Sequence, residues 1–158
     1  MRGNVGTRLA KIEAGEADAT LLAAAGLDRL GMADVGHAIP LDTMLPAPSQ
    51  GAIGIEVRAD DATTHAIIAA INHASTMRCV MAERAFLAAL NADCRSPVAA
   101  NACLGADGTM TLAAEIYDAD GAHGVASRTT VADDDEPATL AAHMLASAPD
   151  SVRALFAG

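Results

Sequence analysis

The sequence predicts an α/β segment followed by a compact α+β unit. In the first part, a helical pattern that opens at residue 7 precedes an apolar run over residues 17–25, and this order is typical of an α/β layer. In the second part, Asp-Gly pairs separate three stretches of strand pattern, which indicates an antiparallel meander. The three predicted strands are 97–104, 109–118 and 122–131. Helical patterns before and after the meander complete the α+β unit.

The first elements follow a glycine-bearing turn. Thr7 is the expected N-cap of the first helix and Gly15 its expected stop. The run 17–25 fits a buried parallel strand or a short helix, and its length and closing glycine favour the strand. A short helix over residues 27–32 is expected next.

The middle of the chain begins with a connector. Residues 45–51 are rich in proline, serine and glycine, and residues 52–58 then alternate as a strand does. Asp61 is the expected cap of one helix, and Ser75 is the expected cap of a second, longer one.

The alternation in the meander predicts a sheet with one covered face. Its apolar positions in the central strand are Met110, Leu112, Ala114 and Ile116. The acidic residues 133–136 suit the start of a final helix that covers this face.

Composition excludes two classes of partner. The formal net charge is −10 at pH 7, which argues against a nucleic-acid backbone or an anionic membrane. Aromatic residues make up 2% of the chain, too few for stacking platforms. The chain has no apolar run of membrane-spanning length and no apolar signal core at its N-terminus, so we expect a cytoplasmic protein.

A local anion site is still compatible with this charge. Arg2 and Arg8 flank a Gly/Asn turn at a helix N-terminus, where backbone N–H groups and guanidinium groups converge. Arg29 follows the predicted buried strand and can point to the same crevice. The alternative is a solvated pair of arginines beside a turn.

The three cysteines differ in their predicted settings. Cys94 lies in a short loop after a long helix, beside Arg95. Cys79 falls inside the helix and Cys103 inside a strand, so both are expected to behave as small core hydrophobes. From spacing alone, a single loop cysteine is more often inert than reactive. The five histidines show no metal-ligand spacing, and no metal is expected.

Four blocks of the sequence match a set of family motifs. Residues 2–9 read RGNVGTRL, residues 22–31 read LAAAGLDRLG, and residues 45–58 read LPAPSQGAIGIEVR. The fourth block is AERAFL, which opens at Ala82 and runs on to Cys94. In this order the blocks resemble the hydroxymethylbilane synthase family, also called porphobilinogen deaminase, with its motifs RGNVxTR, LAxAGLxRLG and LPAxGQGAxGIExR and the stretch that leads to its cofactor cysteine.

The resemblance implies a transferase of tetrapyrrole and heme biosynthesis, which condenses porphobilinogen into hydroxymethylbilane on a dipyrromethane primer. By motif position, Cys94 is the residue that holds this dipyrromethane cofactor through a thioether. Arg2 and Arg8 match family residues that bind the cofactor's carboxylates. Arg29 and Gln50 match substrate-binding positions.

The resemblance also implies the domain plan. Residues 1–46 correspond to the end of a second domain, an α/β domain like a periplasmic binding protein. Residues 47–74 correspond to the connector, strand and helix that return to the first domain, and residues 75–158 to a third domain with a small three-stranded antiparallel sheet covered by helices.

Three departures from the family pattern stand out. Ala92-Asp93 replaces the usual Gly-Gly before the cysteine, which stiffens the loop and puts a carboxylate beside the thiol. Ser49 stands where the family has glycine. The family also continues upstream of this chain, with a first domain that holds the catalytic Asp, so no catalytic residue is expected here.

We therefore expect a C-terminal fragment that is inactive alone. Its expected partners are porphobilinogen and, where supplied separately, the N-terminal half, and it is otherwise expected to self-associate through orphaned sheet edges. The alternative function is a non-catalytic module that binds an anion or a pyrrole, or a fragment that only self-associates.

Overall fold

A computed structural model describes residues 2–157 of the chain. The chain forms two compact units, Met1–Pro40 and Leu41–Gly158. The three-part division drawn from the resemblance stays a prediction.

The first unit holds two helices, α1 (Val5–Glu13) and α2 (Ala24–Arg29). The N-cap of α1 is Asn4, whose side-chain oxygen accepts from the Thr7 backbone N–H at 2.9 Å. The prediction that Thr7 is the cap was therefore wrong. Asn4 takes this place because it lies three residues before Thr7, so its side-chain oxygen reaches a free N–H of the first turn, and the Thr7 hydroxyl bonds to the same oxygen.

The two strands predicted in the first half do not form. Residues 17–23 and 52–58 are irregular, and α2 begins within the expected strand. Leu21 is 62% exposed and Ile53 is 77% exposed. A strand is stable only beside a partner strand, and residues 2–73 supply none to either segment.

The second unit begins with two helices, α3 (Ala62–Ala69) and α4 (Ala74–Ala89). Asp61 caps α3 by accepting from the Thr64 N–H at 2.9 Å, as predicted. The N-cap of α4 is His73, so the cap predicted at Ser75 was wrong by two positions.

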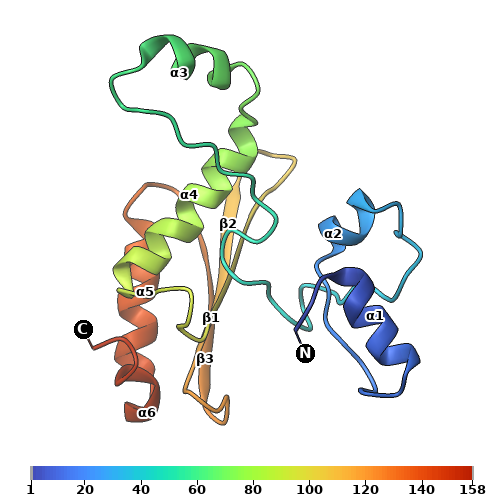
Figure 1. Cartoon of the computed structure of the whole chain (residues 1–158). Helices are drawn as coiled ribbons and strands as arrows, with labels where there is room; N and C mark the ends of the chain where they lie inside the picture. Colours follow the sequence, from blue (N-terminus) through green and yellow to red (C-terminus); the bar gives the residue numbers. More distant parts are fainter. Residues whose placement is uncertain (1, 158) are drawn as a thin grey trace. The chain divides into compact units, whose positions relative to one another are not determined.

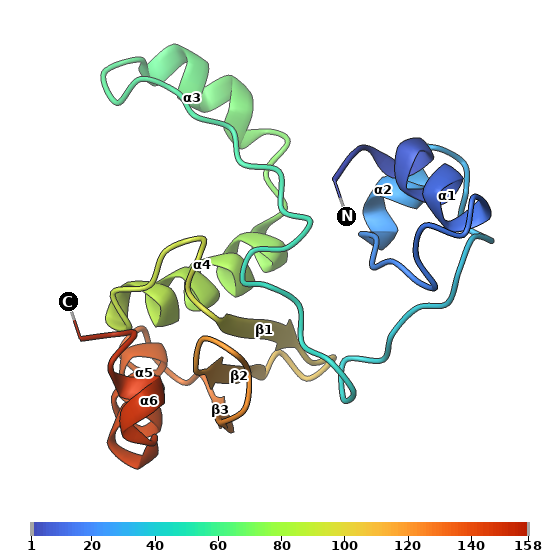
Figure 2. The ribbon, with the colours of Figure 1, turned by 60° about the horizontal axis from the view of Figure 1, so that its bottom comes forward.

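The meander forms as predicted. Strands β1 (Val98–Leu104), β2 (Met110–Tyr117) and β3 (Gly124–Thr130) make one antiparallel sheet in the order β1-β2-β3. Figure 1 labels the three strands, and Figure 2 shows β2 between its two neighbours. The tight connections contain Gly108 and Gly121, both with positive φ.

Helices α4 and α5 (Glu136–Ser147) pack on one face of this sheet, and the short helix α6 (Asp150–Arg153) follows. Figure 2 shows the helices gathered on one side of the strands. Along β2, buried and half-buried residues alternate without a break, so the predicted covered face is confirmed. The fully buried side chains at its centre include Phe86, Leu90, Leu112, Ile116 and Met144.

Within residues 2–157, no helix combines the length and the apolar character that a bilayer crossing requires.

Candidate functional site

The turn before α1 is built by its sequence. Gly3 has a φ of +126°, and a Cβ at this position would lie 2.8 Å from the Thr7 side chain, so only glycine fits. Arg8 Nε donates to the Gly3 carbonyl oxygen at 3.1 Å, and its Nη1 donates to the Leu21 carbonyl oxygen at 3.2 Å. Arg8 therefore ties this turn to the segment that precedes α2.

The other two predicted arginines of the first unit are exposed. Arg2 lies just before the cap, and Arg29 lies in the last turn of α2. Their guanidinium groups make no hydrogen bond to another residue within 2–157. This unit therefore carries solvent-facing cationic groups near one structured turn.

In the second unit, Glu83 joins the connector to the sheet. Its carboxylate is buried, with the residue 6% exposed. Oε2 accepts from the Ser49 N–H at 2.6 Å, and Oε1 accepts from the Ala102 N–H at 2.8 Å. The Ala100 N–H, on the same edge of β1, donates to the Pro46 carbonyl oxygen at 3.1 Å. The free edge of β1 is thus covered by the connector and by one carboxylate.

A solvent-open cavity of about 340 Å³ lies beside this contact. Gln50 lines it together with Ser75, Cys79 and Glu83. Ser49, also in its wall, has a φ of +61°, and its buried Oγ has no hydrogen-bond partner among the described residues. A serine here carries a backbone strain that the glycine typical of the family avoids.

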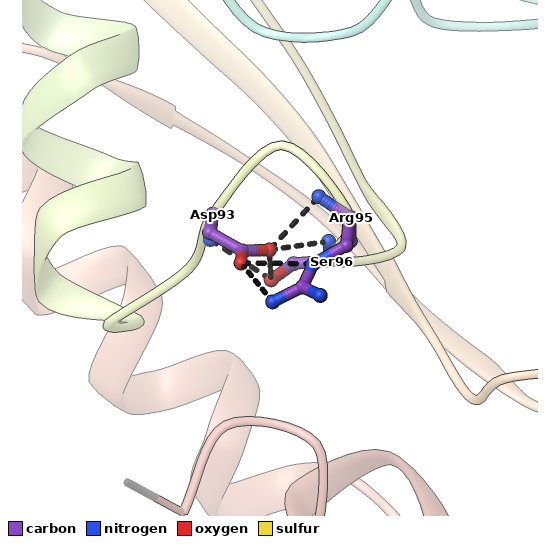
Figure 3. Close-up of polar contacts among 3 residues, drawn as sticks. All are labelled: Asp93, Arg95 and Ser96. Atoms are coloured by element: carbon purple, nitrogen blue, oxygen red, sulfur yellow. Dashed lines mark hydrogen bonds and ion pairs between the residues drawn. The ribbon is translucent and has the colours of Figure 1, made fainter.

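The Cys94 loop follows the C-terminal end of α4. The Cys94 side chain is exposed, and the residues around it form a closed set of hydrogen bonds (Figure 3). Asp93 Oδ1 accepts from the backbone N–H groups of Arg95 at 2.8 Å and Ser96 at 3.2 Å. The Ser96 hydroxyl accepts from the Asp93 N–H at 2.9 Å.

The second oxygen of the same carboxylate holds a guanidinium group. Asp93 Oδ2 accepts from Arg95 Nε at 3.3 Å and Nη2 at 3.1 Å. Hydrogen bonds from the backbone and the guanidinium group of Arg95 lower the pKa of the Asp93 carboxyl from its ordinary value. The residue that replaces a family glycine therefore orders the loop and stays ionised beside Cys94.

The other two cysteines differ from Cys94 and from each other. Cys79 is half-buried on α4, and its burial raises the pKa of its thiol. Cys103 is exposed, which corrects its expected place in the core. It pairs with Thr111 on the sheet face away from the helices, and its Sγ donates to Asn101 Oδ1 at 2.9 Å. Of the two exposed thiols, Cys94 is the one in a loop next to a cationic side chain.

The predicted residues fall into three places. Arg2, Arg8 and Arg29 belong to the first unit, and Gln50 and Cys94 to the second. Gln50 lies near the first half of α4, whereas Cys94 follows its last turn, and the 16 residues of this helix span roughly 24 Å. The structure does not bring Gln50 and Cys94 together.

Besides Glu83, sequence reasoning missed a second buried carboxylate. Asp118 is 6% exposed and accepts from His123, through its backbone N–H and ring Nδ1, and from the Ser151 hydroxyl. Burial raises the pKa of this carboxyl, but these hydrogen bonds outweigh burial and hold the pKa at about 2. The group ties the β2-β3 turn to α6.

Within residues 2–157, no cluster of three or more His, Cys, Asp or Glu side chains is arranged to hold a metal ion.

Two family models match the chain. The model described as "Porphobilinogen deaminase, dipyromethane cofactor binding domain" covers residues 1–66. The model described as "Porphobilinogen deaminase, C-terminal domain" covers residues 77–147, which include Cys94 and the whole sheet. The family resemblance drawn from the motifs is thereby confirmed.

Curated relatives agree. A porphobilinogen deaminase of Sphingopyxis alaskensis is 61% identical over 157 residues, which are 99% of this chain and 50% of the relative. Those of Chromobacterium violaceum and Paracoccus denitrificans are each 50% identical, over 77% and 80% of this chain and 39% and 40% of their own lengths. The chain spans half or less of the length of these relatives. With both models matched in order and with these identities, the chain belongs to the porphobilinogen deaminase family.

Proposed function

We propose that this chain is the cofactor-carrying part of a hydroxymethylbilane synthase, a transferase of tetrapyrrole and heme biosynthesis. The reaction condenses porphobilinogen head to tail into hydroxymethylbilane and releases one ammonia at each step. The single observation that carries the proposal is the exposed Cys94 thiol in an ordered loop, within the region that matches the family's C-terminal domain.

Cys94 suits the tether of a dipyrromethane group. The thiol is exposed, so a bulky group fits on it without displacing core residues. A thioether forms when the sulfur bonds to the methylene carbon of porphobilinogen, the amine leaves as ammonia, and the thiol proton goes with it. When bound, the primer supplies the pyrrole end on which the chain is extended.

Three arginines are proposed to neutralise carboxylates. Arg2 and Arg8 are assigned to the cofactor, and Arg29 to the substrate together with Gln50. Support comes from the exposure of Arg2 and Arg29 and from the built turn at Gly3. The chain has a net charge of −10, so exposed guanidinium groups are local positive charges on an acidic protein, and they suit anionic ligands.

The proposed partner is the N-terminal half of the same kind of enzyme, which supplies the catalytic Asp. Large apolar side chains stand exposed on the second unit, and a monomer rarely leaves so many in one region. They include Ile53, Ile55, Ile67, Ile71 and Met77. Bound to this partner, residues 52–58 are proposed to join a sheet, and residues 1–46 to complete a domain like a periplasmic binding protein. Without it, the same surface is proposed to drive self-association.

A cytoplasmic location is part of the proposal. All three cysteines are free, as in proteins of a reducing compartment.

Reconstitution tests the function. The chain is mixed with the N-terminal half of the Sphingopyxis alaskensis relative, and hydroxymethylbilane formation from porphobilinogen is followed. We expect turnover by the mixture and none by either part alone. Binding without turnover would favour the alternative, a non-catalytic pyrrole-binding module.

Cysteine variants assign the tether within the same assay. Cys94→Ser should abolish turnover, whereas Cys79→Ser and Cys103→Ser should retain it. Loss of turnover in Cys103→Ser with normal turnover in Cys94→Ser would transfer the role to the other exposed thiol.

A further inference from the structure

The two oxygens of the Asp93 carboxylate do different work in the Cys94 loop. Oδ1 accepts from the backbone N–H groups of Arg95 and Ser96 and from the Ser96 hydroxyl, at 2.8 to 3.3 Å. Among residues 2–157, Oδ2 accepts only from the Arg95 guanidinium group, at 3.1 and 3.3 Å (Figure 3). The bonds of Oδ1 order the loop, so the guanidinium group can leave Oδ2 without unfolding it.

The Arg95 side chain is held weakly. It is 88% exposed, its Asp93 partner is 55% exposed, and its Nη1 makes no hydrogen bond within residues 2–157. Exposed ion pairs of this kind are weak, because solvent screens them and two side chains lose freedom. A second carboxylate brought close to Arg95 therefore replaces Asp93 at little cost.

A group attached to Cys94 brings such a carboxylate close. The thiol belongs to the residue next to Arg95, so a carboxylate on the attached group meets the guanidinium group at the effective concentration of a short tether, on the order of millimolar. The planar guanidinium group binds carboxylates through parallel N–H bonds, which also fixes their orientation.

We propose that Arg95 binds a carboxylate of the group carried on Cys94, and that Asp93 Oδ2 is the partner that Arg95 leaves to do so. This inference rests on the proposed role of Cys94 and adds a positioning residue to it. The ligand class is a pyrrole with acetate or propionate side chains. Arg95 then orients the attached pyrrole, while Asp93 keeps the loop in shape.

The test compares two alkylating reagents that differ in one charge. Iodoacetate carries a carboxylate and iodoacetamide a neutral amide, and with either one the Cys94 sulfur displaces iodide. The full chain reacts with an equal mixture of both, and mass spectrometry of the Cys94 peptide gives the product ratio. The ratio cancels the thiolate fraction and the exposure of Cys94, which affect both reagents alike.

Arg95→Gln should lower the iodoacetate share by about two- to fivefold, the range of one exposed ion pair. The matched control is Arg78→Gln, which removes an equal charge from an exposed position on α4 and should leave the ratio unchanged. High salt should bring the wild-type ratio towards that of Arg95→Gln. An unchanged ratio in Arg95→Gln overturns the proposal.

The Asp93→Asn variant tests whether Asp93 competes with the attached carboxylate for Arg95, as distinct from a general effect of charge near Cys94. The variant keeps an oxygen for the loop hydrogen bonds but holds the guanidinium group less tightly, so the iodoacetate share should rise about twofold or more. In an Arg95→Gln background, where only the loss of the negative charge acts, the same substitution should give a clearly smaller rise. An equal rise in both backgrounds overturns the role of Asp93 as the competing partner. Failure of Cys94 to carry a cofactor in the reconstituted enzyme would instead refute the proposed function and leave these ratios as they are.

Discussion

Residues 74–157 and residues 2–73 treat their apolar side chains in opposite ways. In the later region, α4, α5, β1 and β2 contribute to one buried core, with Phe86, Leu112 and Met144 at 0% exposure, and β3 packs against it through the partly buried Val125. In the earlier region, Leu27 and Leu45 are the buried apolar residues among those described, while Ile53, Ile67 and other large side chains stand in solvent.

The difference shows which parts of the fold stabilise themselves. The α+β region closes its sheet face with its own helices, and its β1 edge is covered by Glu83 together with the connector from the earlier region. The earlier region carries sequence patterns for strands that have no partner within residues 2–157. Its apolar side chains gain their burial energy, about 25 cal/mol per Å², only when something else covers them.

We expect the largest difference between the two regions when a large apolar side chain is truncated to alanine in each. Phe86→Ala leaves a cavity under the sheet and should lower the free energy of unfolding by about 3–5 kcal/mol. Ile67→Ala, on the exposed α3, should change it by about 0.5 kcal/mol or less. Urea unfolding of the full chain, followed by circular dichroism, measures both. Equal losses in the two variants would contradict the contrast between the regions.

The next effect concerns the contact between connector and sheet. Glu83→Gln replaces one acceptor oxygen by an NH₂ group, so the N–H of Ser49 or of Ala102 loses its partner. An unpaired buried N–H costs about 1–3 kcal/mol. Hydrogen exchange should become faster over residues 45–51, and Glu13→Gln, on an exposed position of α1, should leave it unchanged. Unaltered exchange in Glu83→Gln would show that the connector does not depend on this carboxylate.

Acid should weaken the later region through Asp118. Its pKa is about 2 in the folded chain and near 3.8 in the unfolded chain, so the unfolded chain binds the proton first as pH falls. The stabilisation by Asp118 is therefore complete above pH 4 and is lost between pH 4 and pH 2. Asp118→Asn should remove this part of the pH dependence. Unfolding is measured for both chains from pH 6 to pH 2. If their free energies of unfolding fall in parallel, Asp118 does not cause this loss.

The smallest expected effect is an increase in stability. Ser49→Gly removes a left-handed serine and an orphaned buried hydroxyl, and should stabilise the connector by about 1 kcal/mol. Asn91, the other described non-glycine residue with positive φ, serves as comparison: Asn91→Gly should gain less, because asparagine tolerates this conformation better than serine. Thermal unfolding of the two variants ranks them, and a larger gain at Asn91 would contradict the strain assigned to Ser49.

Elements that depend on local sequence patterns could be predicted, whereas contacts between distant segments could not. The alternation in β2 and the Asp-Gly turns specify the meander without help from distant residues. The same kind of pattern failed over residues 52–58, because a strand also needs a neighbour. Cys103 was misplaced because its face depends on the register with β2, which composition does not reveal.

The candidate site divides in the same way. The exposure of Cys94 followed from its loop position after a helix. The contacts of Glu83 with Ser49 and of Asp118 with Ser151 join residues 34 and 33 positions apart, and no local pattern marks them. The Asp93 contacts span two and three residues, yet side-chain rotamers decide which carboxylate oxygen meets the guanidinium group.

The role of Cys94 is tested most directly by intact mass and peptide mapping. The chain is produced together with the N-terminal half of the Sphingopyxis alaskensis relative in cells that make porphobilinogen. We predict a mass increase of two porphobilinogen units less two ammonia molecules, located on the Cys94 peptide and lost in Cys94→Ser. A bare Cys94 in a complex that forms hydroxymethylbilane, or the same adduct on Cys79 or Cys103, would contradict the account.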